Sequence, residues 1–254
     1  MILTVDIGNT TVALTALERR GDDYEVVFSD KLPSRDPENL YTPVERLLDG
    51  RGAFEGAVLS SVVPELTGRV CDAVERVIGS PVTAINSRDC GALRFDVDEP
   101  KKIGLDRIAD SAWAAYRYPL PAVTVDFGTA TTFNVIGEGA VFLGGMIASG
   151  IATSVNALAE RAAQLPPIEL NAPERLIGRN TAECMLSGAV IGAAAMTDGI
   201  AARVEAQLGK PVSLILTGGG AELAEPFCLY PHVCEPWLLA KGLAHIYENL
   251  SKKL

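Results

Sequence analysis

The stretch T-V-D-F-G-T-A-T-T at 124–132 decides the fold. An apolar approach ends in Asp126, and Gly128 and three threonines follow, a pattern that predicts a buried strand entering a tight turn. Gly128 lets the chain turn and lets a ligand approach the backbone closely. Nearly the same sequence, T-V-D-I-G-N-T-T, occurs at 4–11. The repetition indicates an internal duplication in which each half opens with the same strand and turn.

The composition is that of a well-packed acidic protein. The 254 residues suffice for one large or two moderate domains; 48% are hydrophobic, and the formal net charge is −10. Without a basic block, nucleic-acid binding is disfavoured. The five cysteines are scattered and form no C-x-x-C pair, which is typical of reduced thiols. The first residues read as a strand instead of a signal peptide, and the apolar run 185–196 is too short for a membrane span. We therefore expect a soluble, cytoplasmic protein without a membrane partner.

Hydrophobic periodicity predicts alternating strands and helices. The loop 29–43 and the irregular segment 86–103 interrupt them. The pattern, ββ(β)…αβα in each half, indicates two α/β lobes with a cleft between them, the first over 1–116 and the second over 117–254. Whether the terminal helix 237–250 packs back on the first lobe stays open. We expect strands at 2–7, 11–17, 24–28, 57–63, 81–85 and 212–216, and helices at 44–49, 65–78, 106–116, 152–163, 237–250 and, as one helix or two, 181–208.

The two related turns are suited to binding a polyphosphate. Backbone N–H groups and hydroxyls in tight turns coordinate phosphate oxygens, and a carboxylate at a strand end can hold Mg²⁺. A third glycine-rich turn, T-G-G-G at 217–220, presents no side chains that would obstruct a flat ligand. The chain has neither the G-x-x-x-x-G-K-[ST] loop nor G-x-G-x-x-G at its first strand, which argues against P-loop and dinucleotide-binding folds.

Asp106 is the best candidate for the group that accepts the proton of an attacking hydroxyl. It lies in the first turn of an expected helix, beside Arg107, which is able to bind an anionic group of a substrate. Taken alone, G-L-D-R at 104–107 fits equally a helix N-terminus with a solvated arginine. The spacing of Cys228, His232 and Cys234 argues against a metal site, because no fourth ligand is nearby.

Several motifs together resemble the type III pantothenate kinases, within the acetate and sugar kinase/actin-like superfamily, almost from end to end. They are D-I-G-N-T at 6–10, G-L-D-R at 104–107, D-F-G-T-A-T-T at 126–132, G-G-M-I at 144–147, A-L-A-E-R-A-A-Q-L-P at 157–166, G-R-N-T at 178–181, T-G-G at 217–219 and K-G-L-A-H-I-Y-E-N at 241–249. The resemblance implies two duplicated actin-like (ribonuclease-H-like) lobes with a nucleotide cleft between them. It also implies ATP-dependent phosphorylation of pantothenate, the first step of coenzyme A synthesis, by a homodimer.

The resemblance also implies roles for individual residues. Asp106 is the proton acceptor, Asp126 binds a monovalent cation, K⁺ or NH₄⁺, and Asp6 binds Mg²⁺ through phosphate or water. The residues implied to hold ATP are Asp6, Ile7, Gly8, Asn9, Thr10, Thr11 and Thr129. The residues implied to contact pantothenate are Gly104, Leu105, Asp106, Arg107 and Thr181.

Two positions depart from the pattern of the family. Ser149 stands where proline is usual, and Val97 stands where some members carry a tyrosine that contacts the substrate. Neither change removes a group that the chemistry needs. Two alternatives remain open: a kinase or phosphatase of the same superfamily with another substrate, and a regulatory nucleotide-binding protein without catalysis.

Overall fold

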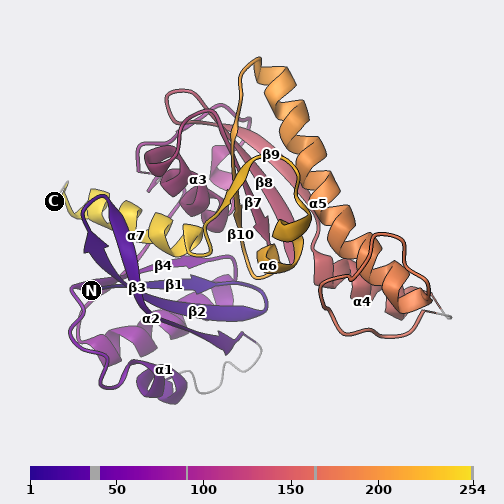
Figure 1. Ribbon diagram of the computed structural model, residues 1–254. Helices are drawn as coiled ribbons and strands as arrows, with labels where there is room; N and C mark the ends of the chain where they lie inside the picture. Colours follow the sequence, from indigo (N-terminus) through magenta and orange to yellow (C-terminus); the bar gives the residue numbers. More distant parts are fainter. Residues whose placement is uncertain (35–40, 90, 163–164, 253–254) are drawn as a thin grey trace. The chain divides into compact units, whose positions relative to one another are not determined.

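The computed structural model describes residues 1–34, 41–89, 91–162 and 165–252 (Figure 1). By its internal contacts the chain divides into two units, each with one β-sheet and its own hydrophobic core. Unit 1 comprises Met1–Arg94, Asp98–Trp113 and Trp237–Leu254, and unit 2 comprises Phe95–Val97 and Ala114–Pro236.

The sheet of unit 1 has the strand order β3-β2-β1-β4-β5. The central strand β1 pairs antiparallel with β2 and parallel with β4. Its strands are β1 (Ile2–Ile7), β2 (Thr11–Arg20), β3 (Asp23–Pro33), β4 (Gly56–Ser61) and β5 (Val82–Ala84). Its helices are α1 (Tyr41–Leu48), α2 (Pro64–Ile78), α7 (Leu238–Ser251) and the first turns of α3 (Leu105–Arg117), which a short 3-10 helix at Pro100–Lys102 precedes.

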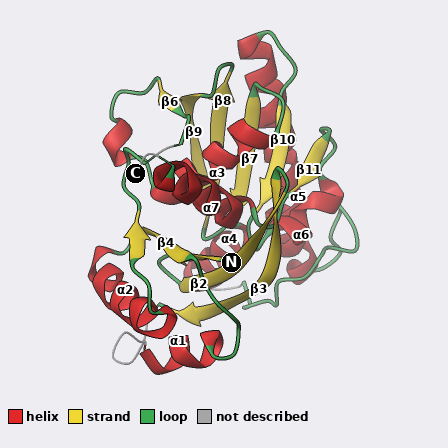
Figure 2. Ribbon diagram, turned by 90° about the vertical axis from the view of Figure 1, so that its left-hand side faces the viewer, coloured by secondary structure: helices red, strands yellow, loops and turns green. Residues whose placement is uncertain are grey.

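The two faces of this sheet are covered by different helices (Figure 2). Leu3, Val5 and Ile7 of β1 pack with residues of α1 and α2 in one buried cluster. Successive side chains of a strand point to opposite faces, so Asp6 lies on the other face. That face carries α7, which contacts β1, β2 and β4. The strand predicted at 2–7 therefore has its carboxylate on the side of the sheet away from α1 and α2.

The sheet of unit 2 repeats the same connectivity. Its order is β11-β10-β7-β8-β9-β6, and its central strand β7 pairs antiparallel with β8 and parallel with β10. The repeated order and pairing confirm the duplication that the two T-V-D sequences predicted. The elements are β6 (Arg94–Phe95), β7 (Ala122–Phe127), β8 (Ala130–Gly137), β9 (Val141–Ser149), α4 (Ile151–Arg161), α5 (Thr181–Leu208), β10 (Ser213–Thr217), α6 (Ala221–Ala224), a 3-10 turn at Glu225–Phe227, and β11 (His232–Cys234).

The structure corrects several expectations from the sequence and decides one alternative that was left open. The strand expected at 24–28 runs on to Pro33, because residues 29–33 continue the ladder with β2; of the expected loop 29–43, residues 35–40 lie outside the described chain. The segment 86–103, expected to be irregular, contains β6, and β11 was not predicted, because both strands are too short to show a period. The stretch 181–208 is one continuous helix. The helix expected at 152–163 ends at Arg161, and residue 163 is not described.

By length and composition alone, α5 is apolar enough to cross a membrane, the one such helix in the described ranges. Its Val190, Ala193 and Ala201 pack in the buried cluster of unit 2. A core helix passes the same test, so this property is weak support for a membrane span.

A close helix contact fixes α3 against α7 in unit 1. A Cβ atom on Gly242 would lie 2.0 Å from the carbonyl oxygen of Ala109. One residue earlier in α7, Lys241 is 7% exposed, pairs with Asp23 at 2.9 Å and lies over the ring of Trp113. Because Asp106 lies in the first turn of α3, this packing helps to position a candidate catalytic residue.

Gly242→Ala should therefore destabilise the protein by about 1–3 kcal/mol, the usual cost of overpacking a tight contact. The matched control is Gly68→Ala in α2, where a Cβ would meet nothing within 4 Å; this change should stabilise the protein by up to about 1 kcal/mol through helix propensity. Urea denaturation of both variants measures the effects. A Gly242→Ala protein as stable as the wild type would show that the contact is not tight.

Candidate active site

The first phosphate-binding turn predicted from the sequence follows β1 and is held by backbone hydrogen bonds. Gly8 N–H donates to the carbonyl of Thr11 at 2.9 Å, and Ser34 N–H donates to that of Thr10 at 3.0 Å. The hydroxyl of Ser34 donates to the carbonyl of Gly8 at 2.8 Å. Asn9 and Thr10 at the tip are exposed. The turn is therefore preorganised while its tip is open to a ligand.

Asp6, at the end of β1, is a carboxylate in a poorly solvated place. Burial raises the pKa of Asp6 from 3.8 to about 6. The Ser60 hydroxyl donates a hydrogen bond to Oδ1 of Asp6 at 2.6 Å and acts in the opposite direction on that pKa. The negative charge of Asp106 raises the pKa further, and the positive charge of Lys31 lowers it. Asp6 and Asp106, predicted separately from the sequence, are thus close enough for their charges to interact.

Asp106 lies in the first turn of α3, where the helix dipole favours an ionised carboxylate. Its Oδ1 accepts a hydrogen bond from the backbone N–H of Arg107 at 2.8 Å. A Cβ on Gly104 would lie 2.3 Å from the same oxygen, so glycine at 104 leaves the space that this carboxylate occupies.

The Arg107 guanidinium is half-buried and lies among acidic groups. Burial lowers the pKa of Arg107, while Asp106 and the buried Asp110 raise it. The arginine remains a cation, because arginine stays protonated in proteins. Arg107 therefore carries a positive charge beside Asp106, as the sequence predicted.

The second turn, in unit 2, is closely packed by glycines from three segments. Gly218 has φ +90°, and a Cβ there would lie 2.0 Å from Oδ1 of Asp126. A Cβ on Gly150 would lie 2.2 Å from the carbonyl oxygen of Gly128. The hydroxyl of Thr153 donates to the carbonyl of Thr129 at 2.7 Å. The structure thus brings together the D-F-G-T turn, the T-G-G-G turn and the end of G-G-M-I-A-S-G, and only glycine permits these approaches.

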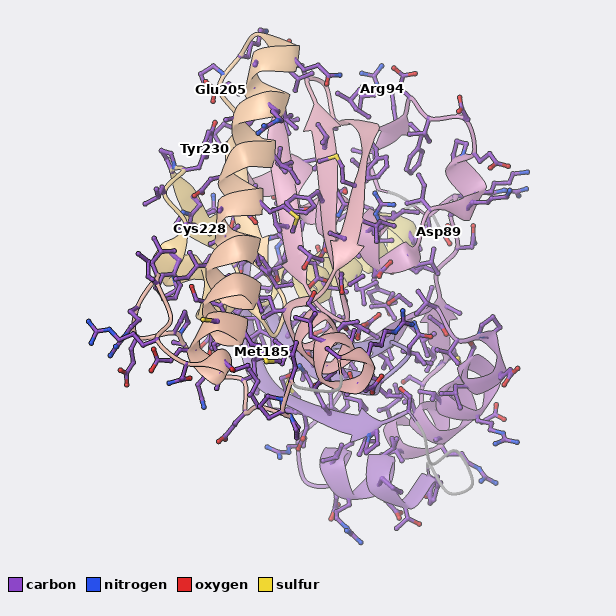
Figure 3. All side chains as sticks on the ribbon, turned by 90° about the vertical axis from the view of Figure 1, so that its right-hand side faces the viewer. Asp89, Arg94, Met185, Glu205, Cys228 and Tyr230 are labelled. Carbon is purple, nitrogen blue, oxygen red and sulfur yellow. The ribbon has the colours of Figure 1, made fainter. Side chains whose placement is uncertain are left out.

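Thr181 is the first residue of α5. The Asn180 side chain caps this helix by accepting a hydrogen bond from the N–H of Glu183 at 3.0 Å. Thr181 also lines a largely apolar cavity of about 580 Å³ in unit 2, together with Ser149, Ile151 and Met185. Figure 3 labels Met185 on α5. Thr181 and Gly104–Arg107 belong to different units, so their joint role stays a prediction.

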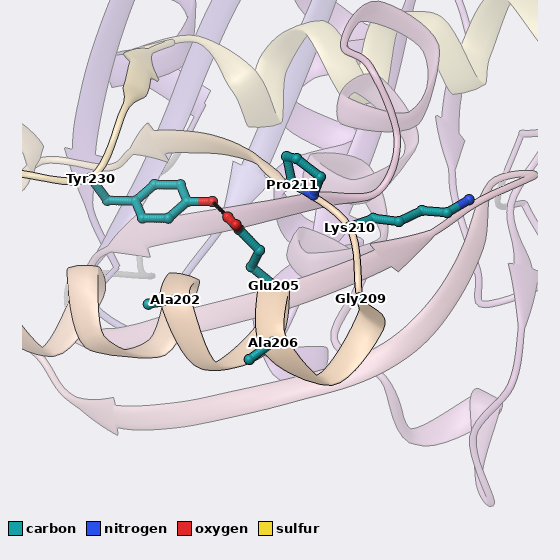
Figure 4. Close-up of a pocket in the computed structure, with 7 residues that line it drawn as sticks. All are labelled: Ala202, Glu205, Ala206, Gly209, Lys210, Pro211 and Tyr230. Atoms are coloured by element: carbon teal, nitrogen blue, oxygen red, sulfur yellow. Dashed lines mark hydrogen bonds between the residues drawn. The ribbon is translucent and has the colours of Figure 1, made fainter.

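A second cavity of about 290 Å³ lies at the other end of α5 (Figures 3 and 4). Its polar groups include Glu205, which accepts a hydrogen bond from the hydroxyl of Tyr230, and Lys210, which pairs with Glu138. None of the residues predicted for the site from the sequence lines it.

Two side chains of the C-x₃-H-x-C segment have partners or surroundings that the structure describes. His232 lies 3.6 Å from a carboxylate oxygen of Glu225, and burial raises the pKa of Cys228 to about 12. Within the described ranges, no three His, Cys, Asp or Glu side chains form a group that could hold a metal ion.

Sequence reasoning missed Ser60 and Lys31 as neighbours of Asp6. Ser60 was part of S-S-V-V-P, interpreted only as a strand end, and Lys31 was placed in a loop. The alternation of β3 would have indicated the face on which Lys31 lies, had the strand been extended to residue 33.

Comparisons of the sequence with known proteins show the family. Residues 2–203 match the sequence model of the family described as type III pantothenate kinase. The type III pantothenate kinase of Thermomicrobium roseum is 35% identical over 258 residues, which cover 100% of this chain and 99% of the relative. That of Thermus thermophilus is 36% identical over 97% of this chain and 98% of the relative.

Solved structures show similarity of fold. A Baf family protein from Campylobacter jejuni superposes with a TM-score of 0.58 at 19% identity, over 98% of this chain and 99% of its own. The ethanolamine utilization protein EutJ from Carboxydothermus hydrogenoformans superposes with a TM-score of 0.50 at 12% identity. The match covers 96% of this chain and 89% of EutJ. These likenesses support the expected α/β fold, in which two sheets share the same strand order around their central strands. The full-length matches in sequence show more than the fold: this chain belongs to the type III pantothenate kinase family.

Proposed function

We propose that this chain transfers the γ-phosphoryl group of ATP to the primary hydroxyl of pantothenate, giving 4'-phosphopantothenate for coenzyme A biosynthesis. The observation that carries the proposal is the match of almost the whole chain to type III pantothenate kinases, and unit 1 has a first turn that is open at its tip. One carboxylate, Asp6, lies just before that turn at the end of β1, and the other, Asp106, lies in the first turn of α3.

The substrate roles follow the predicted residues. The turn Asp6–Thr11 binds ATP phosphates with backbone N–H groups and hydroxyls, and Thr129 in the second turn contacts ATP. Asp106 orients and deprotonates the attacking hydroxyl of pantothenate. Gly104, Leu105, Arg107 and Thr181 contact pantothenate; among these, Arg107 is the cation that suits the carboxylate of the vitamin.

The donor groups fit the expected ions. Mg²⁺ commonly binds through one or two carboxylates together with waters and substrate phosphates, and Asp6 supplies such a carboxylate. Bound Mg²⁺ neutralises charge on the phosphates of ATP. Asp126, under the T-G-G-G turn, supplies a carboxylate for a monovalent cation, K⁺ or NH₄⁺.

We further propose that units 1 and 2 correspond to the lobes expected at 1–116 and 117–254, with helix 237–250 joined to the first. The protein acts in the cytoplasm, without a nucleic-acid or membrane partner, as its acidic composition suggests.

Asp106→Asn should lower kcat by about 10²-fold or more and leave the fold intact, because the amide accepts no proton at neutral pH. ADP release is measured with ATP plus pantothenate, and compared with ATP plus glucose and with ATP alone. The control is Asp98→Asn, at an exposed carboxylate before the 3-10 turn. A near-wild-type rate in Asp106→Asn would exclude the assigned role. Pantothenate would be refuted as the substrate if the wild type released ADP with glucose and not with pantothenate. It would also be refuted if none of the three mixtures released ADP.

Activity should also depend on K⁺ or NH₄⁺. The rate of the wild type is measured in buffers that contain only K⁺, only NH₄⁺ or only Na⁺ at equal ionic strength. We expect a marked loss in Na⁺, and Asp126→Asn should remove the difference between K⁺ and Na⁺. Equal rates in the three buffers would argue against the cation site.

We propose a homodimer that uses the apolar surface of unit 2 around the 580 Å³ cavity. The support is a set of exposed aliphatic side chains in this unit: Leu158 (46% exposed), which lines the cavity, Leu176 (67%) and Ile177 (81%). Exposed apolar groups of this kind are typical of protein interfaces.

Sedimentation velocity should therefore give the mass of two chains, and the double variant Leu176→Asp, Ile177→Asp should shift the protein toward the monomer. Leu229→Asp, at another exposed leucine in unit 2, is the control and should remain dimeric. A monomeric wild type, or a double variant that sediments like the wild type, would contradict the proposed interface.

A further inference from the structure

One row of residues runs across the sheet of unit 1 at the level of Asp6. Asp6 pairs with Ala13 on β2, and Ala13 pairs with Lys31 on β3. On the other side, Asp6 pairs with Ser60 on β4. Directly opposed residues of paired strands project from the same face. Lys31, Ala13, Asp6 and Ser60 therefore share one face of the sheet.

The packing of neighbouring residues agrees with this assignment. Val12 and its partner Leu32 pack in the cluster with α1 and α2, on the opposite face. Lys31, next to Leu32, therefore points to the side of Asp6. The residue between Lys31 and Asp6 is alanine, whose short side chain leaves the space above β2 open. β3 and β1 lie two strand spacings of about 4.8 Å apart, and a lysine side chain spans the first of them, which brings its ammonium group over Ala13 toward Asp6.

The duplicated row in unit 2 has different chemistry. There Asp126 pairs with Thr132 on β8 and with Thr217 on β10, and Thr132 pairs with Ile147 on β9. Ile147 thus takes the position of Lys31. The common fold therefore does not require a cation at this position, and Lys31 belongs to the chemistry of the first turn alone.

A positive charge in this row would offset the negative charges that meet there. Two interacting carboxylates, Asp6 and Asp106, lie near a turn that is to receive several phosphate charges. The positive charge of Lys31 lowers the pKa of Asp6, so its influence extends to the carboxylate. Among the described residues, no ion pair within 4 Å joins Lys31 to an acidic side chain.

We propose that Lys31 is a nucleotide-binding residue, whose ammonium group reaches across Ala13 and contacts the γ-phosphate of ATP at the Asp6–Thr11 turn. The inference rests on the proposed function only in taking ATP as the phosphoryl donor. A lysine that contacts the γ-phosphate distinguishes ATP from ADP, since ADP lacks that group. It therefore favours exchange of the spent nucleotide for a new one.

The test is isothermal titration calorimetry with Mg²⁺ and either a non-hydrolysable ATP analogue or ADP. Lys31→Met should weaken binding of the ATP analogue by about 10- to 100-fold, the range for a lost charge-assisted hydrogen bond, and change ADP binding by less than threefold. Lys31→Arg should restore most of the affinity. Ala13→Leu keeps the charge and fills the gap, so it should weaken the ATP analogue selectively as well.

Lys210→Met is the matched control, because it removes a half-exposed lysine from the other unit, paired only with Glu138 among the contacts described. It should bind both nucleotides as the wild type does. In steady-state assays, Lys31→Met should raise KM for ATP and leave KM for pantothenate unchanged, a split that a general loss of folding would not produce.

Two results would overturn the inference: wild-type affinity of Lys31→Met for the ATP analogue, or an equal loss of affinity for the analogue and for ADP. Calorimetry needs no turnover, so it decides the role of Lys31 even if the wild type releases no ADP with pantothenate. A wild type that releases no ADP with pantothenate would refute the proposed substrate. The inference about Lys31 would then be decided by the binding data alone.

Discussion

The candidate site depends on a carboxylate that the fold keeps partly out of water at the end of β1. Burial makes the charged form of Asp6 costly, and the nearby negative charge of Asp106 adds to that cost. Two neighbouring residues offset it: Ser60 donates a hydrogen bond, and Lys31 contributes a positive charge. Two carboxylates in such a site favour the binding of a cation, either a side chain of the protein or a metal ion that enters with a nucleotide.

Duplication explains how one chain obtains two similar turns with different tasks. Both sheets place an aspartate at the end of the central strand, paired with a hydroxyl residue of the adjacent parallel strand: Asp6 with Ser60, and Asp126 with Thr217. The flanking segments differ. Asp126 lies beneath a glycine turn, whereas Asp6 interacts with Lys31 and with Asp106. The fold therefore supplies the carboxylate, and its surroundings determine which charges gather near it.

The sequence allowed prediction of those features that depend on local order along the chain. The repeated T-V-D motif predicted two related strand–turn units, and the helical period after Asp106 predicted α3. Features that depend on pairing between distant segments could not be predicted from the sequence. The contact of Ser60 with Asp6 requires the register of β1 and β4. The placement of Lys31 requires β3 to continue to Pro33 through its ladder with β2, although S-D-K-L-P on its own is typical of a loop.

Glycine positions show why motif residues and chemical residues are easily confused. Gly104 and Gly218 each lie against a carboxylate oxygen, of Asp106 and Asp126 respectively, at a distance that no Cβ tolerates. A motif such as G-L-D-R therefore joins a residue that provides chemistry with one that provides space. Replacing the glycine would displace the carboxylate and so mimic the loss of the acid itself. Loss of activity on mutation of Gly104 would accordingly say little about direct contact with a substrate, whereas an isosteric change of the carboxylate separates the two roles.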